Sequence, residues 1–473
     1  MIFHSLDFLL FMLFVLAVYW QLGRRAQNLF LLGVSYFFYG YVHPWFLYLI
    51  FASTVVDYLC GLTMARFPEK KRFVLWFSMV SNLTFLGYFK YFGFFVENVA
   101  ELLRLLGLPS FTNTLDIFLP VGISFYTFQS MSYIIDVYAG RLKARENFFE
   151  FALFVVFFPQ LVAGPIERAI TFLPQIEKAR SISATDVRDA LFLLVWGFFK
   201  KLVIADNVAY IVNKLFALEE TTFALAWIGV LAFGVQVYAD FSAYTDMAHG
   251  SARLIGFKLS PNFNHPFIAA SPAEFWKRWH ISLSSYIQDY IFLPLFFHFR
   301  ARGVRYGVEK GLLITFFLIG LWHGAGWNFI VFGLYHGMLV IVYDRCKAVT
   351  PIGIRESPWI RPFQVVLMFF FIHVGFLLFR EGEIAYIVRH LSLSPFATTT
   401  ALQDRAAWFL FGQTLLWSLP LWINTAYVHV KDHLFRAPES RIRTALHLLV
   451  SALMFYAILV VRGDSEAFIY FQF

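Results

Sequence analysis

Cysteine and charged residues are both scarce in this chain of 473 residues. The two cysteines, Cys60 and Cys346, are too few for a disulfide scaffold or a cysteine-based zinc site. Charged residues make up 14% of the chain and hydrophobic residues 59%, and the mean hydropathy is +0.65. A soluble globule could not cover so much apolar surface. The composition therefore excludes a soluble protein and predicts an integral membrane protein.

Apolar runs recur along the whole chain, and a membrane-spanning helix needs about 20 such residues. We expect roughly 11 transmembrane helices, with short re-entrant or interfacial helices between them. The fold class predicted is thus an all-α polytopic membrane protein. The runs lie near Phe8–Trp20, Asn28–Tyr41, Trp45–Ala65, Phe73–Leu86, Phe118–Ile135, Phe151–Pro165, Ala190–Phe199, Ala224–Ala239, Gly311–Tyr343, Phe363–Phe379, Trp408–Val428 and Ala445–Val461.

The formal net charge is +8 and the isoelectric point is near 9.3. In so apolar a chain, basic cytoplasmic loops explain this charge better than nucleic-acid binding. Basic residues follow the first, third and fifth runs, at 24–25, 65–72 and 141–145. This alternation predicts an amino terminus outside the cytoplasm. Because the amino terminus carries Asp7 and lacks a basic leader, we expect the first run to be a membrane helix and not a cleaved signal.

Polar residues are concentrated in residues 231–300, between strongly apolar flanks. An ionisable side chain that faced lipid would cost several kcal/mol, so these side chains must line protein-buried or water-filled space or lie at the interface. They are Gln236, Asp240, Asp246, Asn262, Asn264, His265, Glu274, Lys277, Arg278, His280 and Asp289.

The stretch SPAEFWKRWH within this region has the signals of a helix start. Ser271 suits the N-cap, Pro272 the first helical position and Glu274 the third residue of a capping box. A helix that continued from there would place Trp276 and His280 on one face, four residues apart. An amphipathic helix at the membrane interface is an equally good interpretation.

Two further apolar stretches are interrupted by helix-breaking residues. FFPQLVAGPIER contains two prolines and Gln160, and the stretch before it along the chain contains Pro120, Gly122 and Gln129. Non-helical backbone at membrane depth survives only where protein or a cavity surrounds it. We expect broken or re-entrant helices around a chamber at these positions.

Residues 311–343 contain no charged residue but two histidines, His323 and His336. A straight helix of this length would measure about 50 Å, against a hydrocarbon core of about 30 Å. The segment must therefore bend or break, and a break near 324–326 would leave His323 at a discontinuity. Neutral imidazole can accept a proton from an alcohol near pH 7, which suits acyl transfer. We interpret His336, which a resumed apolar run follows, as a packing and hydrogen-bonding residue.

Signatures of other chemistries are missing around these histidines. Residues 311–343 contain neither HxxxH nor HExxH, so nothing there indicates zinc, and the chain has no GxSxG elbow for a serine nucleophile. We expect no bound metal.

Five stretches together resemble the membrane-bound O-acyltransferase family, and most of all its bacterial branch of alginate O-acetylation and teichoic acid D-alanylation. The resemblance implies one membrane domain over residues 1–473, with peripheral helices about 1–110, a core about 111–345 and further helices about 346–473. It also implies a ring of helices around a tunnel in the bacterial inner membrane. The stretches are FFPQLVAGPIER, VYADFSAYTDMAHGSARLIGFKLSPNFNHPF, SPAEFWKRWHISLSSYIQDYIFLPL, GLWHGAGWNFIVFGLYHG and FIYFQF.

The resemblance also implies the roles of two histidines. His323 of LWHG would act as general base on an acceptor hydroxyl, and His280 of KRWH would orient or polarise the reactants. The expected acyl donor is a cytoplasmic thioester, acetyl-CoA, which acts as substrate and not as a bound cofactor. The tunnel would be lined by Trp276, Trp279, Trp322, Asn328, Gln236, Asp240, Asn262, Asn264 and Gln160.

The expected partner is an extracytoplasmic SGNH-type acetyltransferase, or another acyl-acceptor protein, that passes the acetyl group to a polysaccharide. An alginate-like exopolysaccharide is the expected polymer, with cellulose and peptidoglycan open. Transfer of D-alanine from a carrier protein is the nearest alternative. A polysaccharide or lipid transporter is the alternative of another class, and it would need no thioester.

Overall fold

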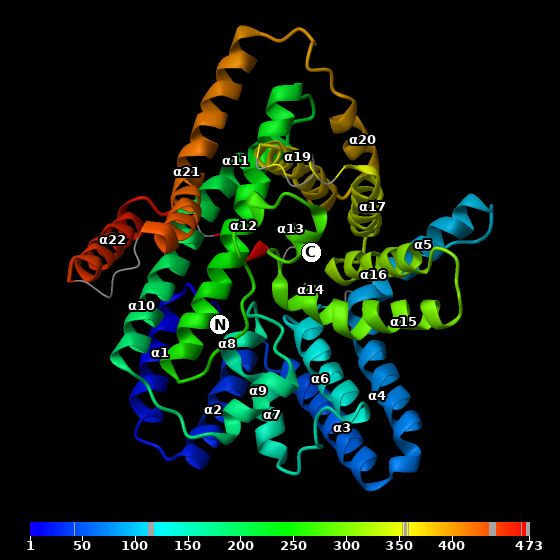
Figure 1. Ribbon diagram of the computed structural model, residues 1–473, viewed down its shortest axis with the longest axis vertical. Coiled ribbons are helices and arrows are strands. Elements are labelled where there is room, and N and C mark those ends of the chain that lie inside the picture. Colours follow the sequence, from blue (N-terminus) through cyan, green and yellow to red (C-terminus); the bar gives the residue numbers. More distant parts are fainter. Residues whose placement is uncertain are drawn as a thin grey trace. The chain divides into compact units, whose positions relative to one another are not determined.

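The computed structural model describes residues 1–473 except 42, 112–117, 352, 354–356, 358, 435–440, 465 and 470–473, and describes only the backbone of 429–434 and 441–447. Every regular element in that part of the chain is a helix (Figure 1). The residues form two compact units, which we describe separately. Unit 1 comprises Met1–Ala190, Ala248–Pro261 and Tyr286–Pro294, and unit 2 comprises Leu191–Met247, Asn262–Ser285 and Leu295–Phe473. The division into a core and two flanking parts stays a prediction.

Five helices among the described residues are long and apolar enough to cross a membrane. They are α3 (Phe46–Arg66), α12 (Phe223–Leu254), α17 (Trp327–Val349), α19 (Arg361–Arg380) and the part Ala401–Val428 of α21 (Ala401–Leu434). Shorter apolar helices are α1 (Leu6–Tyr19) and Leu448–Val460 of α22 (Arg441–Val460). The all-α membrane fold is thus confirmed, whereas the number of roughly 11 spans and the ring around a tunnel stay predictions.

Unit 1 is built largely from the first half of the chain. Besides α1 and α3 it contains α2 (Arg24–Gly40), η1 (Pro68–Lys70), α4 (Lys71–Leu86), the π-helix η2 (Gly87–Tyr91), α5 (Phe92–Leu105), α6 (Ile123–Tyr138), α7 (Phe148–Val156), α8 (Phe158–Leu161), α9 (Ala169–Glu177) and the π-helix η5 (Gln288–Phe292). Four helices contribute residues to both units: α10 (Ala184–Phe199), α12, α14 (Ile281–Ile287) and α15 (Leu293–Ala301).

A buried polar contact joins α3 to α4 within unit 1. The Ser78 hydroxyl donates to Asp57 Oδ1 at 2.6 Å, and Asn82 Nδ2 donates to both carboxylate oxygens at 3.0 Å. All three side chains are buried. Because a carboxylate among apolar helices is costly unless it is hydrogen-bonded, these donors stabilise the pairing of the two helices.

The predicted break in the stretch FFPQLVAGPIER of unit 1 is confirmed, whereas in the earlier stretch α6 begins after Gly122 and continues unbroken past Gln129. α7 ends at Val156 and α8 spans only Phe158–Leu161, after which the backbone is not helical until α9. Gly122, before α6, has a left-handed φ of 79°, and a Cβ there would lie 2.5 Å from the Leu161 carbonyl oxygen. Only glycine fits so close an approach. The chamber expected around these breaks stays a prediction.

Unit 2 holds the remaining helices. Besides α12, α17, α19, α21 and α22 it contains the π-helix η3 (Lys200–Ala205), α11 (Asp206–Phe216), η4 (Pro266–Ile268), α13 (Pro272–Trp276), α16 (Gly307–His323) and α20 (Ile384–Ser392). In Figure 1, α12 is a long green helix and α21 a long orange one.

The uncharged segment 311–343 breaks as expected, because α16 ends at His323 and α17 begins at Trp327. The two helices pack backbone against backbone. A Cβ on Gly320 would lie 2.2 Å from the Phe329 carbonyl oxygen, and one on Gly333 would lie 2.2 Å from the Phe316 carbonyl oxygen. Small residues at both positions allow this approach, as in many membrane helix pairs.

Candidate functional site

His323 is the last residue of α16, and it is buried against aromatic rings. The next residue, Gly324, is extended (φ −167°, ψ 163°), so the chain leaves the helix directly after the imidazole. The His323 ring centroid lies 4.9 Å from that of Trp322, 5.1 Å from Phe379 and 5.6 Å from Phe332. The helix break thus holds the imidazole in an apolar wall.

His280 lies beyond the end of α13. The N-cap is as predicted, since the Ser271 hydroxyl accepts a hydrogen bond from the Glu274 N–H at 3.1 Å. However, α13 ends at Trp276, and His280 has a left-handed φ of 44°. The expectation that Trp276 and His280 share a helix face is therefore wrong, and the Trp276 ring lies 5.2 Å from His336 instead.

Backbone pairing with an earlier segment explains why the helix stops. The Asn264 N–H donates to the Arg278 carbonyl at 2.9 Å, and the Ile281 N–H donates to the Asn262 carbonyl at 2.9 Å. These bonds replace the helical ones on either side of His280. A non-glycine residue with positive φ is strained and persists only where its surroundings hold it.

Asn262 also selects the tautomer of the neutral His280 ring. Asn262 Oδ1 lies 3.0 Å from His280 Nδ1 and accepts from the Ser282 hydroxyl at 2.9 Å. The Ser282 N–H points to the same oxygen at 3.4 Å, which excludes the flipped amide. Because an amide oxygen only accepts, the neutral ring carries its hydrogen on Nδ1, and Nε2 is the basic nitrogen.

Trp322 links the two histidines. Its ring centroid lies 5.7 Å from that of His280 and 4.9 Å from that of His323, and all three side chains are buried. We name Asn262, His280, Trp322 and His323 the two-histidine site. All four belong to unit 2, and the catalytic roles of the two histidines stay a prediction.

Three other predicted lining residues are buried in unit 2 but are not part of this site. Asn328 Nδ2 donates to the carbonyl of Phe379, the neighbour of His323, at 3.4 Å. Trp279 stacks on Phe275 with centroids 5.7 Å apart. Gln236 is buried on α12, and its Oε1 has no hydrogen-bond partner in the part of the chain described.

The last three predicted lining residues form ion pairs or hydrogen bonds with residues outside the two-histidine site. Asp240 forms an ion pair with Lys201 at 3.1 Å. Asn264 is exposed, and its carbonyl accepts from the Arg278 guanidinium at 3.0 Å. Gln160 belongs to unit 1, where its Nε2 donates to the Phe154 carbonyl at 2.7 Å.

Sequence reasoning overlooked two buried cations, Lys200 and Lys201. Lys200 pairs with Asp246 at 2.8 Å and Lys201 with Asp206 at 2.8 Å. Both lysines stand in the apolar stretch FFKKLVIAD, and a cation in such a context requires an acidic partner. That rule could have singled them out.

His336 is buried between helices α13, α17 and α19. Its ring lies 6.0 Å from Phe275 and 4.8 Å from Phe332, and a Cβ on Gly375 would lie 2.5 Å from its Nε2. Its Nδ1 has no hydrogen-bond partner among the described residues. These contacts fit the packing role expected for His336, whereas its hydrogen-bonding role stays a prediction.

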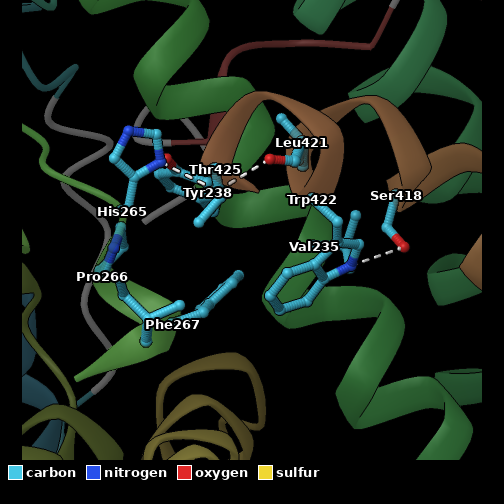
Figure 2. A pocket seen from close by; sticks show the side chains of 10 residues that line it. Val235, Tyr238, His265, Pro266, Phe267, Ser418, Leu421, Trp422 and Thr425 are labelled. Carbon is cyan, nitrogen blue, oxygen red and sulfur yellow. Dashed lines mark hydrogen bonds between the residues drawn. The ribbon is translucent and has the colours of Figure 1, made fainter. Parts of the chain in front are cut away.

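A small cavity lies between α12, α21 and the segment 265–268 (Figure 2). There the His265 imidazole points to the Thr425 hydroxyl at 2.9 Å, and the Trp422 indole N–H donates to the Ser418 hydroxyl at 3.2 Å. The cavity volume is about 10 Å³, enough for one water molecule, so it is not the substrate site. Within the described residues, no group of three or more His, Cys, Asp or Glu side chains could hold a metal ion.

Comparison with known proteins gives consistent matches. The model of the membrane-bound O-acyltransferase family matches residues 141–380, which include the whole two-histidine site. The chain is 39% identical to the probable alginate O-acetylase of Pseudomonas aeruginosa, over 81% of this chain and 73% of that protein. It is 33% identical to the peptidoglycan O-acetyltransferase of Helicobacter pylori, over 77% of this chain and 74% of that protein. It is 30% identical to the teichoic acid D-alanyltransferase of Bacillus subtilis, over 55% of this chain and 68% of that protein.

Proposed function

The chain belongs to the membrane-bound O-acyltransferase family and is a multi-pass membrane O-acyltransferase, and from this premise we propose that it delivers acetyl groups across the membrane to a polysaccharide. The names of two relatives, which state acetyl transfer to alginate and to peptidoglycan, support acetyl as the group and a polysaccharide as its destination. The bacterial inner membrane is the proposed location, with the amino terminus outside the cytoplasm.

The observation that carries the proposal is the two-histidine site at the break between α16 and α17. Acyl transfer needs a base where an acceptor hydroxyl meets the donor carbonyl. A buried imidazole at the end of a broken helix meets that need, because non-helical backbone at membrane depth occurs where protein or a cavity surrounds it. The donor is a cytoplasmic thioester, acetyl-CoA.

The reaction forms one C–O bond and breaks one C–S bond. His323 accepts the proton of the acceptor hydroxyl as its oxygen attacks the thioester carbonyl carbon. The tetrahedral intermediate then expels the thiolate, and the His323 imidazolium returns the proton to that sulfur. The products are an O-acetyl ester and a free thiol, and the imidazole is restored.

His280 positions the reactants. The Nδ1–H is held by Asn262, so Nε2 is the nitrogen that accepts a hydrogen bond. Its strained backbone and its contact with Trp322 fix the ring at one place. The acceptor is an extracytoplasmic SGNH-type acetyltransferase or another acyl-acceptor protein, and an alginate-like exopolysaccharide is the final polymer.

Radiolabelled acetyl-CoA tests the proposal. Inverted membrane vesicles that contain the protein present its cytoplasmic face to the label. We expect label to become esterified to lumenal acceptor and free CoA thiol to appear in equal amount. Polymer movement without thiol release would instead indicate a transporter. Transfer from a D-alanyl carrier protein but not from acetyl-CoA would favour the D-alanylation chemistry.

A further inference from the structure

Residues Gly463–Ile469 belong to unit 2, and we name them the tail segment. The structure describes all of them except residue 465. Phe468 and Ile469 are each 1% exposed. The Phe468 ring centroid lies 4.0 Å from that of Tyr244 and 6.0 Å from that of Phe241, both on α12. Residues 470–473 of the FIYFQF stretch lie outside the described residues.

A buried group of charges anchors this segment. Lys201 Nζ pairs with Asp206 at 2.8 Å and with Asp240 Oδ1 at 3.1 Å, and it donates to the Glu466 carbonyl at 2.8 Å. Asp240 Oδ2 accepts from the Ile469 N–H at 2.7 Å. Both ends of one ion pair therefore hold the tail segment. Buried charges are costly to keep, so removal of the tail segment would leave Lys201 and Asp240 each without one of its buried hydrogen-bond partners.

A π-helix supplies a further contact. The Gly463 N–H donates to the Leu202 carbonyl of η3 at 2.8 Å. A Cβ on Gly463 would lie 2.9 Å from the Asn207 nitrogen and 2.9 Å from the Asp206 carbonyl carbon. Since both of these are backbone atoms, only glycine fits. π-helical turns are rare and are frequently found at functional sites.

The tail segment reaches the two-histidine site through one ring. Phe241 is completely buried, and its ring contacts His280 edge to face, with centroids 4.8 Å apart at 83°. The same ring lies 6.0 Å from the Phe468 ring, centroid to centroid. Phe241 thus contacts both the tail segment and the imidazole that Asn262 orients.

We propose that the tail segment is a positioning element of the acyl-transfer site, in which Lys201 and Asp240 anchor the segment and Phe468 holds Phe241 against His280. This inference rests on the proposed function. Lys201, Asp240 and Phe468 act through other residues and are positioning residues.

The alternative is that the tail segment only stabilises unit 2. A purely stabilising segment would change the thermal unfolding midpoint but not the turnover of molecules that remain folded. Phe468→Ala separates the two roles, and Phe455→Ala is its matched control because Phe455 is exposed on α22. Phe468→Leu, which keeps most of the bulk, is the conservative rescue.

The experiment measures acetyl transfer from labelled acetyl-CoA in vesicles, per folded molecule and well below the unfolding midpoint. We expect Phe468→Ala to lower kcat about tenfold, as a displaced reactive group does, while KM for acetyl-CoA stays within about twofold. Phe468→Leu restores most of kcat, and Phe455→Ala stays within about twofold of the parent. A kcat for Phe468→Ala equal to that of Phe455→Ala overturns the proposal.

Hydrogen exchange tests the anchor independently of activity. We expect the Ile469 amide to be protected in the parent, to exchange faster in Lys201→Met, and to regain protection in Lys201→Arg. Equal exchange in the parent and Lys201→Met overturns the anchoring role. If the parent itself transfers no acetyl group, the proposed function fails, whereas the exchange result still decides whether Lys201 holds the tail segment.

Discussion

The protein has two buried polar clusters, one within regular helices and one at positions where helices end. The Asp57 cluster of unit 1 joins α3 to α4, and all its members lie inside regular helices. In the two-histidine site of unit 2, His323 ends a helix and His280 has a left-handed backbone between two short helices. Both clusters are equally buried.

The comparison shows that polarity and burial do not by themselves identify a site. Ser78 and Asn82 satisfy the Asp57 carboxylate by hydrogen bonds across regular helices, which is how membrane helices pack. The two histidines lie where helices stop, in the kind of backbone that membrane proteins keep where protein or a cavity surrounds it. Four predictions test this contrast.

The largest effect is expected from His323→Ala. Loss of a general base costs about 100-fold to 10,000-fold in rate, so polymer O-acetylation should fall below detection while the protein still reaches the membrane. Acetyl content of the extracellular polymer and membrane abundance are the two measurements. Normal acetyl content would remove His323 from the chemistry.

A smaller effect on activity is expected from substitutions that disturb the packing of α16, which ends at His323, against α17. In Gly333→Ala the new methyl meets the Phe316 carbonyl oxygen at 2.2 Å, whereas in Gly337→Ala it meets Phe316 Cβ at 3.1 Å. The longer contact is relieved by a small shift of α16, whereas the shorter one forces the two backbones apart. We expect Gly333→Ala to lower both activity and the unfolding midpoint strongly, and Gly337→Ala to change them little. Equal effects would contradict the close packing of α16 and α17.

Asn262→Ala should lower acetyl transfer about tenfold by releasing the His280 ring. Asn262→Asp keeps the accepting oxygen and should retain more activity. The measurement is kcat and KM in vesicles, with the loss expected in kcat. An unchanged kcat in Asn262→Ala would show that the orientation of His280 is not needed.

Asp57→Ala should leave turnover per folded molecule within about twofold of the parent and destabilise the protein by about 1 to 3 kcal/mol, because Ser78 and Asn82 lose a buried acceptor. Thermal unfolding and vesicle activity measure the two effects. A large loss of turnover without loss of stability would erase the distinction between the two clusters.

The features that could be predicted from the sequence are those that depend on residues close together along the chain. The Ser271 cap follows from local spacing, and the break after His323 follows from glycines in a segment too long to cross the membrane straight. The family resemblance, now supported by the matches over residues 141–380, supplied the roles of the histidines.

Contacts between residues far apart in the sequence could not be predicted from local sequence patterns. The chain turns at His280 because its flanking backbone pairs with Asn262 and Asn264, which no local pattern encodes. Asp240 stays a predicted lining residue, and no local pattern indicates its ion pair with Lys201 or its hydrogen bond with the Ile469 N–H. Sequence spacing cannot link residues so far apart.

Chemical rescue tests the central claim most directly. The His323→Gly protein lacks the imidazole, and added imidazoles of graded basicity can replace it. The account predicts negligible acetyl transfer without them and partial recovery that rises with the basicity of the added compound. Transfer by His323→Gly at the rate of the parent, or recovery that does not depend on basicity, would contradict it.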